Sequence, residues 1–237
     1  MTTDAVQVLY EDNHLLVVNK PPLLATMGAV SGTPTAVAWG KDYIKRKYNK
    51  PGNVFLGVVS RLDSFVSGAL PLARTSKAAQ RLTQAFAQRK VDKLYLALVK
   101  GDFESTQDRW VDWVKKNDRR KRMELVASSE QGSQQAILHF EVLNRWRGVS
   151  LVAIQLETGR KHQIRVQFAD RGHPILGDRK YGGEAVDSDG IFLHCYRLRL
   201  PHPTQDRTVE IVADLPPHWL RRCPRLDEGL KSLASRG

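Results

Sequence analysis

Residues 58–70 read Val-Val-Ser-Arg-Leu-Asp-Ser-Phe-Val-Ser-Gly-Ala-Leu and place one carboxylate, that of Asp63, close to Arg61 in a largely apolar run. The preceding apolar residues predict a strand, and Ser67-Gly68 predicts a tight turn. Asp63 is therefore expected at a strand end, a place where catalytic side chains are often found. Two structural roles compete with catalysis, since such an aspartate can also cap a turn or pair with Arg61.

The hydrophobic pattern on both sides of this stretch predicts many strands and few helices. Strands are expected over residues 6–10, 15–20, 53–59, 69–74, 92–101, 109–116, 135–146, 149–159, 191–200 and 208–213. Helices are expected over residues 33–48, begun by Thr33 and Pro34, over 75–90 and over 159–173. Because the strands follow one another in hairpin-like succession, the expected fold class is α+β, a central and mostly antiparallel mixed sheet with flanking helices. A single domain over residues 1–237 is expected, with the tail 216–237 unassigned or forming a terminal helix.

The chain is strongly basic, with 37 Lys and Arg against 25 Asp and Glu and a formal net charge of +12. This charge suits a polyanion, with nucleic acid as the first candidate, although solubility alone explains it about as well. The basic run over 115–122 is expected to be a solvated stretch, which could also widen an RNA footprint.

The cysteine count and the termini indicate the compartment. Cys195 and Cys223 are too few for a disulfide framework and lack zinc-site spacing, which favours a reducing compartment. The chain shows no signal-peptide pattern and no run of about 18 apolar residues, so a cytoplasmic protein without a membrane partner is expected.

Several kinds of chemistry lack their sequence patterns here. The seven histidines are scattered without metal-site spacing, and neither a phosphate-binding loop nor the nucleophile elbow of a serine hydrolase occurs. No metal and no cofactor are therefore expected. Asp63 remains as the strongest candidate for a reacting group.

Four segments resemble the pseudouridine synthases, and among them the RluA branch. These segments, in order, are SRLDSFVSGALPLARTSKAAQRL (60–82), DKLYLALVKG (92–101), LETGRKHQIRVQF (156–168) and HPILGDRKYGG (173–183). The resemblance extends over about residues 6–215 and implies a largely antiparallel sheet with helices. It further implies an enzyme that detaches uracil from its ribose in structured RNA, ribosomal or transfer, and rejoins it through carbon 5 without a cofactor.

The resemblance assigns catalytic roles to three residues. Asp63 matches the catalytic aspartate of the Arg-Leu-Asp motif, Tyr95 the tyrosine of the Lys-x-Tyr-x-Ala strand, and Arg165 the basic residue of GRKHQIR. Tyr95 is expected to stack on the extruded base, and Arg165 to hold the carboxylate charged and oriented. Substrate contacts are expected from the neighbouring motif residues Arg61, Lys93, His162, Gln163 and Ile164. Taken alone, a strand tyrosine is more often part of the core and a helix arginine more often solvated.

The sequence departs from the branch at two positions, Ser60 where His is usual and Val66 where Thr is usual. Neither change removes a proposed catalytic group, so activity is expected to survive with altered substrate contacts. The chain is also expected to be a monomeric short form without the small N-terminal RNA-binding domain of longer members. Two alternatives stay open: a catalytically silent RNA-binding or RNA-chaperone protein, and an enzyme acting on a free nucleoside or another small anion.

Overall fold

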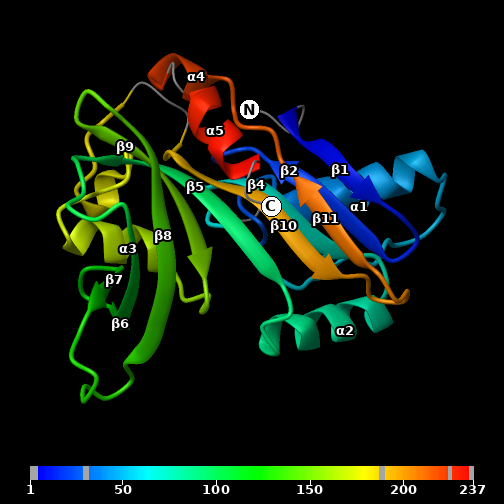
Figure 1. Cartoon of the computed structure of the whole chain (residues 1–237). Helices are drawn as coiled ribbons and strands as arrows, with labels where there is room; N and C mark the ends of the chain where they lie inside the picture. The colour runs from blue at the N-terminus through cyan, green and yellow to red at the C-terminus, as the bar shows by residue number, and fades with distance from the viewer. Residues whose placement is uncertain (1–4, 29–31, 187–189, 224–225, 235–237) are drawn as a thin grey trace. The chain divides into compact units, whose positions relative to one another are not determined.

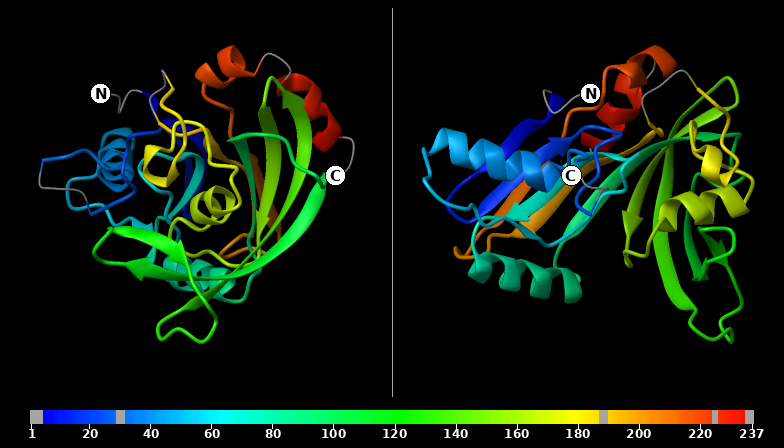
Figure 2. Two further views of the ribbon diagram at one scale, coloured as in Figure 1. Left: turned by 90° about the vertical axis from the view of Figure 1, so that its left-hand side faces the viewer. Right: turned by 180° about the vertical axis from the view of Figure 1, so that it is seen from behind.

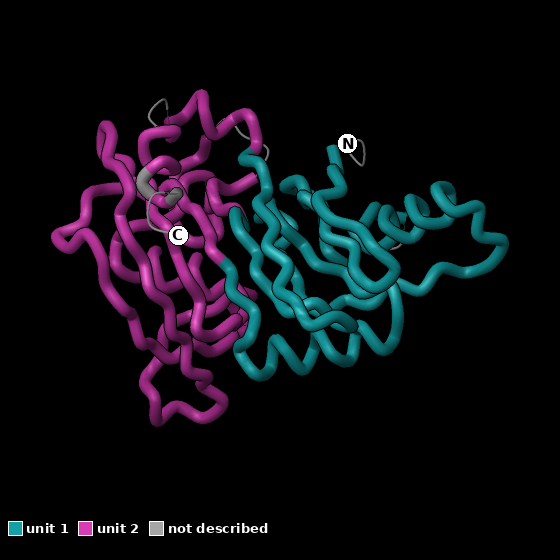
Figure 3. The backbone as a smooth tube through the Cα atoms, turned by 45° about the vertical axis from the view of Figure 1, so that its right-hand side comes forward, with its two compact units in different colours: residues 1–93, 195–215 teal, residues 94–194, 216–237 magenta. Residues whose placement is uncertain are grey.

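A computed structural model describes residues 5–28, 32–186, 190–223 and 226–234. The chain divides into two compact units (Figure 3). The first comprises residues 1–93 and 195–215, and the second comprises residues 94–194 and 216–237.

The elements are labelled in chain order in Figure 1. They are β1 (Gln7–Glu11), β2 (Leu15–Lys20), α1 (Ala36–Lys47), β3 (Gly57–Val58), β4 (Ser67–Ala73), α2 (Ser76–Ala87), β5 (Asp92–Lys100), β6 (Gln107–Asn117), β7 (Arg122–Leu125), β8 (Gln134–Trp146), β9 (Val149–Leu156), α3 (Gln163–Asp170), the short 3₁₀ helix η2 (Arg179–Tyr181), β10 (Leu193–Pro201), β11 (Thr208–Val212), α4 (His218–Arg222) and α5 (Leu226–Ala234).

The first unit is built on strands in the order β1-β2-β4-β10, with β3 paired to β4 and β11 paired to β10. The pairs β1/β2, β2/β4, β3/β4 and β10/β11 are antiparallel. Leu16 of β2 lies opposite Leu72 of β4, and both are fully buried. Gly40 lets α1 pack closely in this unit, because an added Cβ there would lie 2.7 Å from the Leu56 side chain. Figure 2 shows α1 and α2 beside the strands of this unit.

The second unit is built on strands in the order β5-β9-β8-β6-β7, all paired antiparallel. Helix α3 contacts β6 and β7, and its Phe168 packs on Trp110 and Phe140 with ring centroids 4.7 and 5.7 Å apart. Helix α5 contacts β8, and its Gly229 lies so close to Leu151 of β9 that an added Cβ would stand 2.7 Å from the Leu151 side chain. The two helices cover buried apolar strand residues, which is what stabilises this unit.

The α+β prediction, with a mostly antiparallel sheet and flanking helices, is confirmed. Two local predictions in these segments were wrong. Helix α1 is capped by Thr35 rather than Thr33-Pro34, because the Thr35 side chain accepts the Ala38 N–H at 3.1 Å. The strand predicted over 53–59 is reduced to β3. The basic stretch 115–122 contains no buried residue, as the predicted solvation requires, and it continues β6 and begins β7.

The tail 216–237 contributes two helices, α4 and α5, while residues 224–225 and 235–237 of that segment lie outside the described part of the chain. Trp219 of α4 is fully buried and packs on Phe192, with ring centroids 5.5 Å apart. Across the described ranges, no helix combines the length and apolarity needed to cross a membrane.

Candidate active site

Asp63 lies in the loop between β3 and β4 of the first unit. Its Oδ1 accepts the Phe65 N–H at 3.1 Å and the Ser64 hydroxyl at 3.3 Å, and its carbonyl accepts the Val66 N–H at 3.1 Å. The side chain therefore does cap its own turn, as the structural alternative predicted. Arg61, two residues before Asp63, is exposed. The Asp63 residue is half-buried, so it retains access to solvent.

Two side chains from the β2 region hold the backbone on either side of Asp63. The buried Thr26 hydroxyl accepts the Leu62 N–H at 3.1 Å and donates to the Leu62 carbonyl at 2.8 Å. Lys20, at the end of β2, donates to the carbonyls of Leu24 at 2.8 Å and of Ser64 at 3.3 Å. The backbone at residues 62 and 64 is thus held by side chains from outside the loop.

Lys20 is fully buried, and this burial lowers the pKa of its amine to about 7, while the negative charge of Asp63 acts in the opposite direction. The amine also donates to the Pro21 carbonyl at 2.8 Å. A buried cation near Asp63 favours the ionised carboxylate, so Lys20 is a site residue that the sequence analysis missed.

Ser60 and Lys93 form a further contact at this loop. Lys93 Nζ donates to Ser60 Oγ at 2.7 Å and lies 4.9 Å from the centroid of the Phe86 ring. Burial lowers the pKa of the Lys93 amine, with the opposing effect of Cys195 second. The Lys93 side chain is therefore engaged within the protein.

Gly68 follows the loop and begins β4 with a φ of +116°. An added Cβ would lie 2.4 Å from the Cys195 carbonyl oxygen, so no other residue fits without a backbone shift. The tight turn predicted at Ser67-Gly68 lies instead at residues 63–66, and Ser67 and Gly68 begin β4. Gly68 therefore serves the close approach of β10.

Arg165 lies on α3 of the second unit and is 3% exposed. Its Nε and Nη2 donate to the two carboxylate oxygens of Asp178 at 2.6 and 2.7 Å. This bidentate pair fixes the plane of the guanidinium, whose other edge carries the remaining donors.

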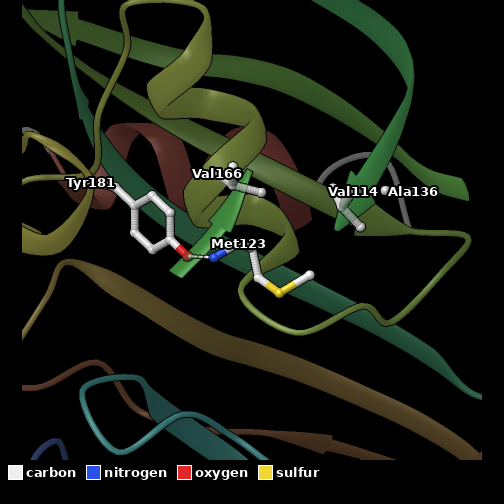
Figure 4. Close-up of a cluster of buried hydrophobic side chains, with 5 residues drawn as sticks. All are labelled: Val114, Met123, Ala136, Val166 and Tyr181. Carbon is white, nitrogen blue, oxygen red and sulfur yellow. Dashed lines mark hydrogen bonds between the residues drawn. The ribbon is translucent and has the colours of Figure 1, made fainter. Parts of the chain in front are cut away.

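Tyr181 supports Arg165 from a second direction, with the guanidinium carbon 5.0 Å from the centroid of the ring. Its hydroxyl accepts the buried Met123 N–H at 2.9 Å (Figure 4). The same hydroxyl lies 2.8 Å from His162 Nδ1. The ring packs with Val114, Met123 and Val166 in one buried cluster. Burial raises the pKa of Tyr181, which keeps the hydroxyl protonated for the contact with His162.

Gln163 is buried, and its side-chain amide is used inside the protein. Its Oε1 accepts from the Thr158 hydroxyl at 2.8 Å and the Arg160 N–H at 3.0 Å, and its Nε2 donates to the Ile137 carbonyl at 3.0 Å. His162, at φ +54°, precedes it in the left-handed region, so α3 begins at Gln163 and is shorter than the predicted 159–173.

The predicted site residues fall into two groups. Asp63, Arg61 and Lys93 belong to the first unit, whereas Tyr95, His162, Gln163, Ile164 and Arg165 belong to the second. Tyr95 is 6% exposed on β5 and Ile164 is 4% exposed on α3. Their catalytic and substrate-binding roles stay predictions.

The sequence analysis missed Lys20, Thr26, Asp178 and Tyr181. A signal was present for two of them, since Asp178 and Tyr181 stand in the quoted motif HPILGDRKYGG without an assigned role. Within residues 5–28, 32–186, 190–223 and 226–234, no three His, Cys, Asp or Glu side chains are grouped in a way that could hold a metal ion.

The chain is similar to known proteins over most of its length. Residues 14–170 match the family model described as RNA pseudouridylate synthase. The chain is 32% identical over 216 residues to ribosomal large subunit pseudouridine synthase C of Buchnera aphidicola, covering 88% of this chain and 67% of that protein. It is 34% identical over 218 residues to the protein of the same name from Pasteurella multocida, covering 89% and 65%. The chain thus spans about two thirds of the length of these relatives.

A solved structure is similar over nearly the whole chain. Human RNA pseudouridylate synthase domain containing 4 superposes with a TM-score of 0.76 at 24% identity, covering 93% of this chain and 92% of that one. This likeness supports the fold.

Proposed function

Since the chain belongs to the RNA pseudouridylate synthase family, we propose that it isomerises specific uridines of structured RNA to pseudouridine. The reaction breaks the bond between ribose C1′ and nitrogen 1 of uracil and forms a bond between C1′ and carbon 5. Carbon 5 loses a proton to solvent and nitrogen 1 gains one, so the protons balance. Pseudouridine is an isomer of uridine, so the reaction consumes no second substrate.

The observation that carries the proposal is the way Asp63 is held. The carboxylate stands on a loop whose backbone is fixed by Thr26 at residue 62 and by Lys20 at residue 64. A reacting group needs this kind of fixed direction, because misplacement by about 1 Å can cost about a hundredfold in rate. Surface aspartates that only cap turns do not need a buried lysine beside them.

In this proposal Asp63 attacks the sugar or the base, or removes a proton from the ribose. Arg165 supplies a fixed cation that keeps the carboxylate ionised where water is excluded, and its pair with Asp178 orients it for that role. Tyr95 stacks on the extruded uracil, with Arg61, Lys93, His162, Gln163 and Ile164 as candidate contacts to the substrate.

We propose large-subunit ribosomal RNA as the first substrate to test, because two similar proteins are named for the ribosomal large subunit. Transfer RNA is the second. The net charge of +12 supports an RNA rather than a free nucleoside, and binding is expected to weaken steeply with salt as counterions are released. The same proposal has the protein act in the cytoplasm as a monomer without a metal.

The test uses pseudouridine mapping by carbodiimide-dependent stops of reverse transcription. Total RNA is compared between cells lacking the gene and cells rescued with wild type or Asp63→Ala. The proposal expects one or more stops that vanish on deletion and return with wild type alone. If no stop changes, or if Asp63→Ala restores the stops, the proposal is wrong and the alternative of a catalytically silent RNA-binding protein is favoured.

A further inference from the structure

The loop that carries Asp63 is held at three alternate residues. Thr26 binds Leu62 and Lys20 binds Ser64, as described above, and the third fixed residue is Ser60. The contacts at residues 62 and 64 are made to the backbone, and the contact at residue 60 is made to the Ser60 side chain. Together they restrain the loop on both sides of Asp63.

The third contact joins the loop to β5. Lys93 is the second residue of this strand, and its Nζ lies 2.7 Å from Ser60 Oγ. Residues two apart in a strand point to the same face, so Lys93 and Tyr95 share a face of β5. The Ser60 contact is thus made from the strand face that also bears Tyr95.

The surroundings of Lys93 argue against an RNA-binding role. Its amine lies over the Phe86 ring at 4.9 Å and is desolvated, as the lowered pKa also indicates. Lysines that bind phosphate need an accessible charge, because they act as hydrated point charges. Lys93 instead directs its amine at a hydroxyl of the protein itself.

We propose that Lys93 is a positioning residue, which acts through Ser60 to fix the direction in which the loop presents Asp63. The inference rests on the proposed function and gives Lys93 a role other than substrate contact. It also gives a role to Ser60, which stands where His is usual. Its hydroxyl accepts the hydrogen bond from Lys93 at 2.7 Å.

The experiment compares Lys93→Met, Ser60→Ala and the double variant with wild type. Ser60→Thr keeps the hydroxyl and serves as the conservative variant, and Lys90→Met removes an exposed lysine three residues before Lys93 as a charge control. The substrate is large-subunit ribosomal RNA transcribed with uridine tritiated at carbon 5. Single-turnover tritium release measures the rate, and filter binding measures the Kd for the same RNA.

Both single variants are expected to lower the single-turnover rate about tenfold or more, with the Kd changed by less than about twofold. The double variant is expected to match the single ones, because both remove the same contact. Ser60→Thr should recover most of the rate, and Lys90→Met should equal wild type. A raised Kd with an unchanged rate at saturation would make Lys93 a substrate contact, and additive losses would break the link through Ser60.

Hydrogen exchange of the loop amides at 62–66 provides a readout that needs no catalysis. Faster exchange in Lys93→Met and Ser60→Ala, but not in Lys90→Met, is expected if the contact holds the loop. Exchange equal to wild type in all variants would overturn the inference. A wild-type enzyme that releases no tritium counts against the proposed function, while the exchange result still decides the role of Lys93.

Discussion

Arg165 and Asp178 form a buried bidentate ion pair, with Nε–Oδ2 and Nη2–Oδ1 distances of 2.6 and 2.7 Å. Both side chains are almost completely removed from solvent, at 4% and 1% exposure. Such a pair is costly to desolvate, so it is weak support for stability by itself. The pair does fix the orientation of the guanidinium. Because this group is planar, the directions of its remaining N–H donors are fixed as well.

Asp178→Asn is predicted to destabilise the protein by about 3–5 kcal/mol, because the buried Arg165 charge would lose its counterion. Urea denaturation followed by circular dichroism measures this change. If the variant folds, the single-turnover rate is also expected to fall, since Asn cannot accept both guanidinium donors in the same geometry.

Glu184→Gln is the control for this prediction. Glu184 pairs with Lys100 at 2.7 Å, but the two side chains are 58% and 55% exposed, so little change in stability is expected. If Asp178→Asn is as stable as Glu184→Gln, the buried charge of Arg165 does not depend on Asp178 as its counterion.

Tyr181→Phe is predicted to cost about 1–3 kcal/mol of stability, because the buried Met123 N–H would lose its acceptor. The ring would stay in the cluster of Figure 4 and beneath Arg165. Exchange of the Met123 amide, measured by NMR, should therefore accelerate more than exchange of the neighbouring β7 amides. An unchanged exchange rate of the Met123 amide would mean that the Tyr181 hydroxyl is not needed to hold β7 in place.

The fold was predictable where apolar periodicity is long, as in β8 and β9, and where a threonine precedes an amphipathic run, as at Thr75 before α2. It was not predictable at β7, whose four residues include only one buried side chain, that of Met123. Pairing with β6 and docking on Tyr181 form this strand, and neither contact leaves a local pattern. The start of α1 was misplaced for a local reason, since Thr33 and Thr35 both resemble helix caps and it is Thr35 that accepts the Ala38 N–H.

Asp63 could be predicted as a site residue because the motif around it is contiguous in sequence. Its supports could not, since Thr26 and Lys20 act across 36 and 44 residues of chain. A lysine after an apolar strand is usually expected to be solvated, yet Lys20 is fully buried. Such residues are recognised only when the carbonyls that they bind are known.

Lys20 leads to a prediction about pH. Its pKa is about 7 in the folded protein, below its ordinary value near 10.5, so between these values the unfolded chain binds more protons than the folded one. Stability is therefore predicted to rise with pH across this window, by up to about 1.4 kcal/mol per pH unit relative to Lys20→Met, which cannot titrate. Urea denaturation of both proteins at pH 7, 8 and 9 measures the difference. A difference that stays constant would place the Lys20 pKa near its ordinary value.

Gly68→Ala is predicted to be strongly destabilising, by about 2–4 kcal/mol, because it combines a φ of +116° with a Cβ 2.4 Å from the Cys195 carbonyl oxygen. Gly132→Ala is the matched control, with a φ of +80° but no atom within 4 Å of the added Cβ, so only the backbone strain of about 1 kcal/mol is expected. Thermal unfolding of the two variants separates close contact from strain. Because Gly68 lies five residues after Asp63, the single-turnover rate of a folded Gly68→Ala protein should also fall, whereas Gly132→Ala should retain the wild-type rate. Equal losses of stability in the two variants would mean that β4 and β10 can separate at this point without cost.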